Sequence, residues 1–426
     1  MAVKTGIYGL YKFYRRDGTS KFLSSTAESV YRAGTTNWEM IAGGLSSDTQ
    51  VYFTRYNDWC IFVGGIWPEK YDATTSTSLG MGDSPNNYLP WRAKYVIATL
   101  DRLWFGNTTQ NDGTVSPHYV QYSEVGTPTA DGTGESWPAV NYLTTQNRMP
   151  VTGLGVLDRR PIIFDEDGVN VVYGTTQATF ALKRYPPLGC AAARSIANTE
   201  GSLIFLSKRG IAAFSGGISK LIFPEKLENF IDRINMTYIE KCAGIYYKDE
   251  YWLSYPYDTA TVNDRTLVVN LKTSDVTNLD KGYNCFAIWD GVGDSGELYG
   301  GSTSAGKVYK LDTTYADESS NISAYWQGKY FDLDRPELRK RFYRIFPWVY
   351  ASGAGTLTIT VDIDYGTQTD TLTATLASGT NRHEIDFHGV KEGRFIRFKF
   401  ANDSQIDFHL LGFIVEFDYL PLGAEI

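Results

Sequence analysis

Residues 201–217, GSLIFLSKRGIAAFSGG, indicate the fold class because one short segment holds two strand signals separated by a turn. Leu203–Leu206 is an apolar run bounded by glycine and serine, which is typical of a β-strand. The closing Gly216-Gly217 pair easily reaches the positive φ angles of tight hairpin turns. Runs of the same character recur along the chain, and only Pro224–Asn235 has apolar residues at helical spacing. The sequence therefore predicts an all-β protein with one clear helix.

The hairpin segments recur at a regular interval. Their apolar centres are Phe13, Ile61, Trp104, Ile163, Ile204, Trp252 and Leu298. The average spacing is about 47 residues, which matches the roughly 40 to 50 residues of one four-stranded propeller blade. We therefore expect a roughly seven-bladed β-propeller over residues 1–315, without a WD or kelch signature.

The composition and the hydrophobic pattern of the sequence change near residue 312. The polar segment Asp312–Asn321 is typical of a linker, and longer strands with regular alternation follow it. About 100 residues in six to eight such strands suit a β-sandwich, which we expect over residues 320–426. The alternative is that these strands form a last, elaborated blade that closes the ring. The expected strands are Ile322–Leu333, Arg341–Tyr350, Gly355–Tyr365, Thr369–Leu376, Arg394–Phe400 and Ile406–Tyr419.

Composition excludes several classes of protein. The 426 residues include 62 aromatic ones, which intrinsically disordered chains lack. The 40 basic and 48 acidic residues give a net charge of −8, which argues against a dedicated nucleic-acid binder and against an anionic membrane surface as partner. No apolar run has the length of a signal peptide or a membrane span, so we expect a soluble chain that is not exported by the standard secretory route.

The cysteines are too scattered for a disulfide scaffold or a zinc site. Cys60, Cys190, Cys242 and Cys285 lie at least about 40 residues apart. We expect free, buried thiols in a protein that folds in a reducing compartment.

The chain carries no catalytic motif. HExxH, GxSxG, the Walker loop and the dinucleotide glycine fingerprint are all missing. Three of the four histidines, His383, His388 and His409, lie in the expected sandwich, and alternation places the first two on opposite faces of a strand. We therefore expect no catalytic residue, no cofactor and no metal, and predict that the protein is not an enzyme.

A glycosidase is the enzyme class that stays open, because many propellers hydrolyse glycans. Gly34–Trp38 faintly resembles the end of a sialidase Asp box, but the leading Ser-x-Asp is missing. Asp167, Asp249 and Glu250 lie in expected turns, where acids favour the turn geometry itself. The separation of two catalytic carboxylates is a property of the tertiary structure, so the sequence does not exclude such a pair.

One charge cluster stands out in the acidic chain. Arg335, Arg339, Lys340, Arg341 and Arg344 are interrupted by a single acid, Glu337. The cluster could contact DNA or an acidic neighbouring subunit, or it could be a solvated turn that leads into a strand. Arginine together with aromatic residues is the composition that interface cores enrich. We therefore predict that these five residues lie at a subunit or neighbour-protein interface, flanked by Tyr330, Phe331, Phe342 and Tyr343.

Several stretches resemble the β-propeller structural proteins of tailed bacteriophages, the family of tail nozzle, hub, tail-tube and packaged-DNA stabilisation proteins. The stretches that carry the resemblance are Leu10–Thr19, Leu206–Gly217, Tyr251–Pro256, Leu267–Lys272, Phe286–Gly291, Ile322–Trp326 and Arg339–Phe342. The chain departs from the family by entering its first hairpin almost at once, without the longer N-terminal arm. No catalytic residues would transfer from such a family.

The resemblance implies a virion structural protein in the tail or head-to-tail connector, assembled in the cytoplasm of a host bacterium. It implies a homo-oligomeric ring, a hexamer by analogy, with other tail or connector proteins as partners. DNA would pass through the ring without sequence-specific binding. Two other classes stay open, namely a receptor-binding or baseplate propeller at the distal tail and a propeller glycoside hydrolase.

Overall fold

The computed structural model describes residues 6–45, 50–65, 67–80, 89–110, 112–126, 136–199, 201–290, 296–317 and 320–420. The chain divides into two compact units, Met1–Leu311 and Asp312–Ile426. Among the described residues, no helix is long and apolar enough to cross a membrane.

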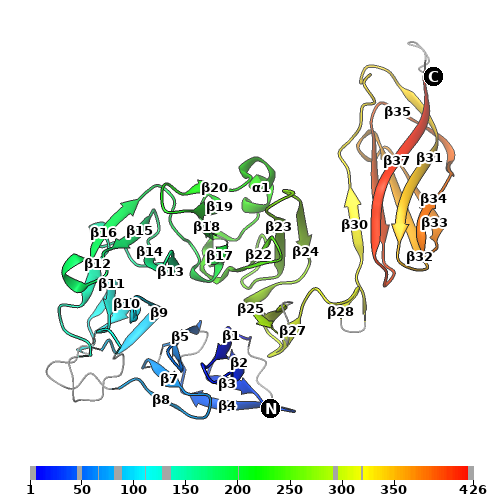
Figure 1. The fold of residues 1–426 in the computed structure, drawn as a ribbon. Helices are drawn as coiled ribbons and strands as arrows, with labels where there is room; N and C mark the ends of the chain where they lie inside the picture. The colour runs from blue at the N-terminus through cyan, green and yellow to red at the C-terminus, as the bar shows by residue number, and fades with distance from the viewer. Residues whose placement is uncertain are drawn as a thin grey trace. The chain divides into compact units, whose positions relative to one another are not determined.

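The first unit is a β-propeller, as the spacing of the hairpins predicts. Its described residues form seven antiparallel sheets in chain order, and Figure 1 shows them arranged in a ring. Blades one to three are β1 (Gly9–Tyr14), β2 (Ser20–Ser25), β3 (Ser29–Ala33) and β4 (Trp38–Gly43); β5 (Tyr52–Tyr56), β6 (Trp59–Val63), β7 (Glu69–Tyr71) and β8 (Ser76–Ser78); and β9 (Arg92–Thr99), β10 (Arg102–Thr109), β11 (Val115–Tyr122) and β12 (Tyr142–Thr144).

Blades four and five are β13 (Gly153–Leu157), β14 (Arg160–Phe164), β15 (Val169–Tyr173) and β16 (Ala181–Tyr185); and β17 (Ala197–Thr199), β18 (Ser202–Ser207), β19 (Gly210–Phe214) and β20 (Lys220–Leu221). Blades six and seven are β21 (Ala243–Tyr247), β22 (Glu250–Tyr255), β23 (Arg265–Asn270) and β24 (Val276–Leu279); and β25 (Tyr283–Asp290), β26 (Gly296–Ser302) and β27 (Val308–Lys310). The hairpin centres expected from the sequence fall on the second strand of blades two to seven, whereas Phe13 lies in β1.

The ring closes between the first and the last blade. The amide of Ile7 donates a hydrogen bond to the carbonyl oxygen of Ser302 over 2.8 Å. The ring of Phe22 on β2 packs against Trp289 and Tyr299 of the seventh blade, with centroids 5.3 and 5.2 Å away. Aromatic contacts of this kind contribute beyond the apolar area that they bury, so they reinforce the seam.

Short polar side chains fix several of the hairpin turns. Carboxylate oxygens of Asp17, Asp72 and Asp112 accept hydrogen bonds from backbone amides two residues further along, each over 2.8 Å. Such turns satisfy backbone donors locally. The repetition of this turn chemistry in successive blades explains why the sequence alone indicates hairpins.

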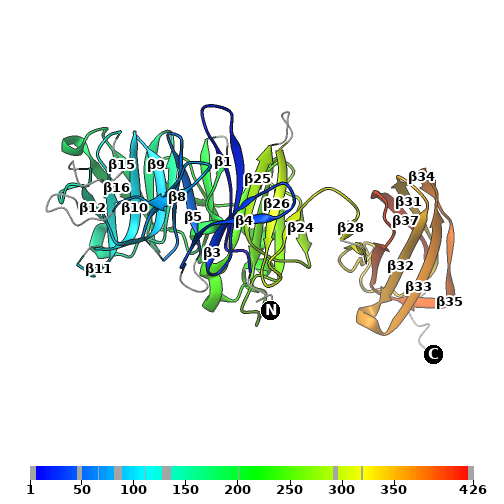
Figure 2. The same cartoon turned by 90° about the horizontal axis from the view of Figure 1, so that it is seen from below.

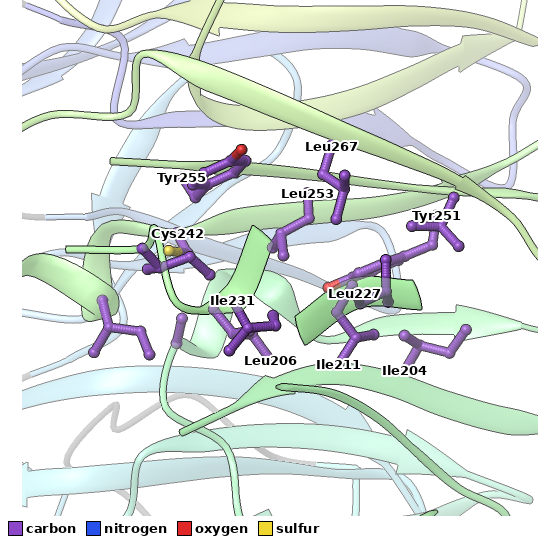
Figure 3. Close-up of a cluster of buried hydrophobic side chains, with 14 of the residues drawn as sticks. Ile204, Leu206, Ile211, Leu227, Ile231, Cys242, Tyr251, Leu253, Tyr255 and Leu267 are labelled. Atoms are coloured by element: carbon purple, nitrogen blue, oxygen red, sulfur yellow. The ribbon is translucent and has the colours of Figure 1, made fainter. Parts of the chain in front are cut away.

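The one α-helix among the described residues packs between the fifth and sixth blades. Helix α1 spans Pro224–Ile231, and Pro224 occupies its first turn. Leu227 and Ile231 face a buried cluster with Ile211 and Leu253, which Figure 3 shows. The sequence places the helix end at Asn235, four residues too far. The chain turns earlier because Ile234 pairs with Tyr257 in a β-bridge.

All four cysteines are free and buried, which confirms the expectation from their spacing. Burial raises the pKa of Cys190 to about 12. Burial is also the main cause that raises the pKa of Cys285 to about 11, although nearby Arg194 lowers it in part.

The second unit is a β-sandwich, as expected, with a short hairpin before it. One sheet has the order β30-β36-β32-β33, and in the other β31 pairs with β34 and β35 on one side and with β37 on the other. Figure 2 shows the two layers. The strands are β28 (Ala316–Asp317), β29 (Ser320–Asn321), β30 (Ala324–Gln327), β31 (Lys340–Ala351), β32 (Gly355–Ile363), β33 (Gln368–Leu376), β34 (Gly379–Arg382), β35 (Ile385–Gly393), β36 (Ile396–Asn402) and β37 (Phe408–Tyr419).

The sandwich has its own core. Ile359 and Val361 from one sheet pack with Ile345 and Val349 from the other, and all four are fully buried. The described residues of this core come from the second unit alone. The strands are therefore not a last blade of the propeller.

Candidate functional site

The predicted interface segment begins in the loop before β31, and its members have different roles. Lys340 is fully buried. Its ammonium donates hydrogen bonds to the carbonyl oxygens of Arg335 and Arg394, over 2.5 and 2.9 Å. Burial lowers the pKa of Lys340. The side chain of Lys340 holds the loop to the sheet and is not available to a partner, which corrects its place in the predicted interface.

The arginines of the segment are neutralised by acids that are distant in sequence. Arg341 lies 2.6 Å from the carboxylate of Glu392 on β35, and Arg339 lies 3.7 Å from the same group. Arg344 contacts Glu384 and reaches Glu416 of β37 over 2.9 Å. The segment that is basic in sequence is therefore part of a surface on which both signs of charge alternate from strand to strand.

Arg335 lies apart from these ion pairs. It is exposed, and its guanidinium carbon is 5.9 Å from the ring centroid of Tyr419. Of the flanking aromatic residues, Phe342 is buried in the sandwich core, whereas Tyr343 is exposed and donates a hydrogen bond to Asp418 over 3.0 Å. The five residues predicted from the sequence thus do not form one continuous basic patch.

Beyond the arginines, the same outward surface of β31 and β37 becomes aromatic and aliphatic. We call it the aromatic face, and it consists of Phe346, Trp348, Tyr350, Leu411 and Ile414. Phe346 lies opposite Ile414, and Trp348 lies opposite Gly412. Tyr350, Leu411 and Ile414 are 39%, 59% and 51% exposed. An outward sheet face normally carries polar residues, so this one has the composition of a contact surface.

Polar groups border the aromatic face. The guanidinium carbon of Arg382 lies 5.0 Å from the ring centroid of Trp348. The ring of His409 lies 5.8 Å from that of Tyr350, and its Nε2 is 3.1 Å from the carboxylate of Asp407. A centre of apolar side chains with a polar border is the composition of protein interfaces. The sequence offered one signal for this face, because Phe346, Trp348 and Tyr350 occupy the strand positions that should be polar.

The propeller contributes a second candidate site, the cavity along its central channel. The cavity has a volume of about 460 Å³ and is lined by residues of the first strand of each blade. Arg194, in the turn before β17, reaches across the channel to the first and second blades. One of its terminal nitrogens donates to the carbonyl oxygens of Tyr8 and of Val51, the latter over 2.8 Å. Nothing in the local sequence Ala191–Ser195 predicts this position.

The carboxylates considered for a glycosidase site do not converge on the cavity. Its described lining contains no Asp or Glu. Asp249 lies in the hairpin of blade six, where Lys272 and Tyr246 donate hydrogen bonds to it and lower its pKa. Glu250 accepts a hydrogen bond from Trp252 over 3.1 Å, and Asp167 lies in the hairpin of blade four. Asp249 and Glu250 therefore stabilise their own turn and strand.

The three sandwich histidines also stay apart. His388 lies on β35 with its Nδ1 2.8 Å from Asp370, whereas His383 lies between β34 and β35. Within the described ranges, no three His, Cys, Asp or Glu side chains lie close enough together to hold a metal ion.

The chain was compared with protein families, curated proteins and solved structures. No protein-family model and no curated protein matches the chain. An extracellular domain of the sensor BT4673 from B. thetaiotaomicron is similar, with 9% identity, a TM-score of 0.47 and coverage of 92% of this chain and 56% of that one. PorZ, a surface component of the type-IX secretion system of Porphyromonas gingivalis, has 10% identity and a TM-score of 0.42. The match covers 87% of this chain and 45% of PorZ. This chain thus spans about half the length of each.

A third similar structure is an enzyme of nearly equal length. The exo-β-1,3-galactanase of Phanerochaete chrysosporium has 8% identity, a TM-score of 0.28 and coverage of 96% of both chains. The class defined by the structure is a β-propeller protein with a C-terminal β-sandwich.

The resemblance to phage tail proteins is wrong. The structural neighbours are bacterial extracellular domains and a glycoside hydrolase, with no phage tail protein among them. Five of the seven stretches that suggested the family are short segments of propeller blades, and the other two lie in the sandwich. Short strand and turn segments of this kind recur in unrelated proteins of one fold. The expectations of a virion location, a hexamer and DNA passage rest on that resemblance alone and lose their support.

Proposed function

We propose that this protein is a non-catalytic binding protein that associates with further copies of itself through the aromatic face of its sandwich. The observation that carries the proposal is the exposure of Tyr350, Leu411 and Ile414 on the outward face of the paired strands β31 and β37. Each large apolar side chain that leaves water contributes about 1.5–3 kcal/mol, so a few of them suffice for a specific contact.

The charges beside the aromatic face fit association between copies. Arginines on β31 lie between acids on β35 and β37, so both signs are presented together. Two copies can meet so that the arginines of one copy face the acids of the other. Such charge pairing sets the register of the contact more than its affinity. A strongly basic or strongly acidic partner would match only part of it.

The alternative is a propeller glycoside hydrolase. Hydrolysis needs two carboxyl groups about 5–9.5 Å apart at one sugar site. The described lining of the channel holds no carboxylate, and Asp249 and Glu250 of blade six are engaged in local contacts. These observations support binding over hydrolysis.

Light scattering of the full chain tests the proposal. The expected native mass is a multiple of 47.7 kDa. Ile414→Glu places a charge on the aromatic face, opposite Phe346, and should weaken self-association by about 2 kcal/mol, a change of roughly 30-fold in Kd. Thr373→Glu is the matched control, because Thr373 is exposed on β33 in the other sheet.

Circular dichroism should show the same melting temperature for both variants. A native protein that is monomeric at all concentrations would refute self-association. Release of reducing sugar from a polysaccharide, abolished by one Asp or Glu substitution, would establish the hydrolase instead.

A further inference from the structure

Arg194 is a cation without a carboxylate partner in the propeller channel. Its guanidinium carbon lies 5.1 Å from the ring centroid of Tyr52, and one terminal nitrogen is held by the carbonyl oxygens of Tyr8 and Val51. No carboxylate of the described residues forms an ion pair with it, and its Nε is buried without a hydrogen-bond acceptor. Arg194 is partly buried, and an anion beside its guanidinium would balance the charge and accept from the unpaired Nε.

The walls around Arg194 are aromatic and uncharged. The ring of Tyr52 meets that of Tyr95 edge to face at 5.1 Å, and Tyr11 stacks on Phe53 at 5.6 Å. Burial raises the pKa of Tyr11, Tyr52 and Tyr95, so these phenols stay neutral at physiological pH. They therefore supply apolar surface and hydroxyl donors but no negative charge to balance Arg194.

The hydroxyl of Tyr95 is a second polar group that the cavity offers to a ligand. The described residues provide no hydrogen bond for its hydroxyl, although Tyr52, which it touches, donates to Gln50 over 2.7 Å. Tyr52 lies in contact with both Arg194 and Tyr95, so the cation and the free hydroxyl belong to one continuous wall.

The size of the cavity restricts what it can hold. Its volume of about 460 Å³ lies within the range of small-molecule sites. An inorganic anion would satisfy the cation and leave the aromatic wall in contact with water. We propose that the channel binds a small organic carboxylate, whose carboxylate group pairs with Arg194 and accepts a hydrogen bond from the Tyr95 hydroxyl, and whose apolar body lies against the rings of Tyr52 and Tyr95. This site is independent of the aromatic face.

Isothermal titration of the full chain with benzoate tests the proposal. Benzamide is the matched neutral probe, because it has the same shape without the charge. We expect one benzoate per chain and benzamide binding at least about tenfold weaker, a difference of about 1.4 kcal/mol. Equal binding of both probes, or no benzoate binding at 10 mM, would overturn the proposal. Phosphate binding as tightly as benzoate would also overturn it, because the site would then recognise charge alone.

Variants then locate the site. Arg194→Met should abolish benzoate binding, whereas Arg209→Met, at an exposed position outside the cavity, should leave it unchanged. Because Arg194 also ties three blades together, its loss can unfold the protein, and Tyr95→Phe supplies the second test. It removes only a hydroxyl and should weaken benzoate several-fold without changing the melting temperature. Unchanged benzoate affinity in Tyr95→Phe and in a folded Arg194 variant would refute the assignment.

Discussion

Replacing Lys340 by Met should destabilise the sandwich far more than replacing its exposed neighbour Arg341. The ammonium of Lys340 joins the loop at Arg335 to the start of β36 through the carbonyl oxygen of Arg394. Methionine keeps the apolar stem but removes the ammonium that donates to both carbonyl oxygens. A hydrogen bond from a charged group contributes about 1.5–3 kcal/mol, so the two together contribute about 3–6 kcal/mol.

Part of that cost is offset, since burial of the charge itself is unfavourable and lowers the pKa of Lys340. We therefore expect a loss of about 2–4 kcal/mol in the free energy of unfolding. For a domain of this size, 1 kcal/mol corresponds to about 4 °C, so the melting temperature should fall by about 8–16 °C.

The assay is scanning calorimetry of the intact chain, with hydrogen exchange to locate the loss of protection in β31 and β36. Arg341→Met is the control, because its ion pair with Glu392 is a surface contact worth about 0–1 kcal/mol. The control should shift melting by less than about 4 °C. Equal, small shifts of the melting temperature in both variants would refute the reasoning and indicate that the Lys340 side chain is exposed to solvent.

Three further outcomes follow from the structure. Asp165 is fully buried, and burial alone would raise its pKa. Hydrogen bonds from Arg184 and Asn170 outweigh burial, so the pKa of Asp165 is lowered overall. Asp165→Asn should therefore lower the free energy of unfolding of the propeller, measured in urea, by about 3–5 kcal/mol. The pKa of Asp165 in the folded protein lies below the unfolded value near 3.9, so this stability is present above about pH 4 and is lost as the pH falls through the folded pKa. The stability of the Asp165→Asn variant should not show this loss when the protein is titrated with acid. Ellman's reagent should find no reactive thiol in the native protein and four after denaturation, and rapid reaction of any native cysteine would contradict their burial. Circular dichroism should show less than about a fifth helix, and a larger fraction would contradict the all-β fold.

Turn chemistry and spacing allowed the sequence to predict most of the fold. Asp17, Asp72 and Asp112 bind their own turns, and strands of the repeating hairpins pair with their neighbours in the chain. These are local interactions, so a local pattern reports them. The strand β34 was missed, and β35 was expected only around His383 and His388, because Gly379 and Gly389, both at positive φ, interrupt the alternation that marks a strand.

The chemistry of the candidate sites depends on contacts between distant parts of the chain. Arg344 is basic in sequence, yet the acids that neutralise it lie 40 and 72 residues further along, at Glu384 and Glu416. Arg194 lies in a run of small residues, and only closure of the ring brings it to the carbonyl oxygens of Tyr8 and Val51. The sequence by itself determined which segments become strands, because backbone preference and turn geometry act over a few residues. The tertiary structure alone decided which charges are paired, buried or free, because electrostatic partners are chosen by distance in space and not along the chain.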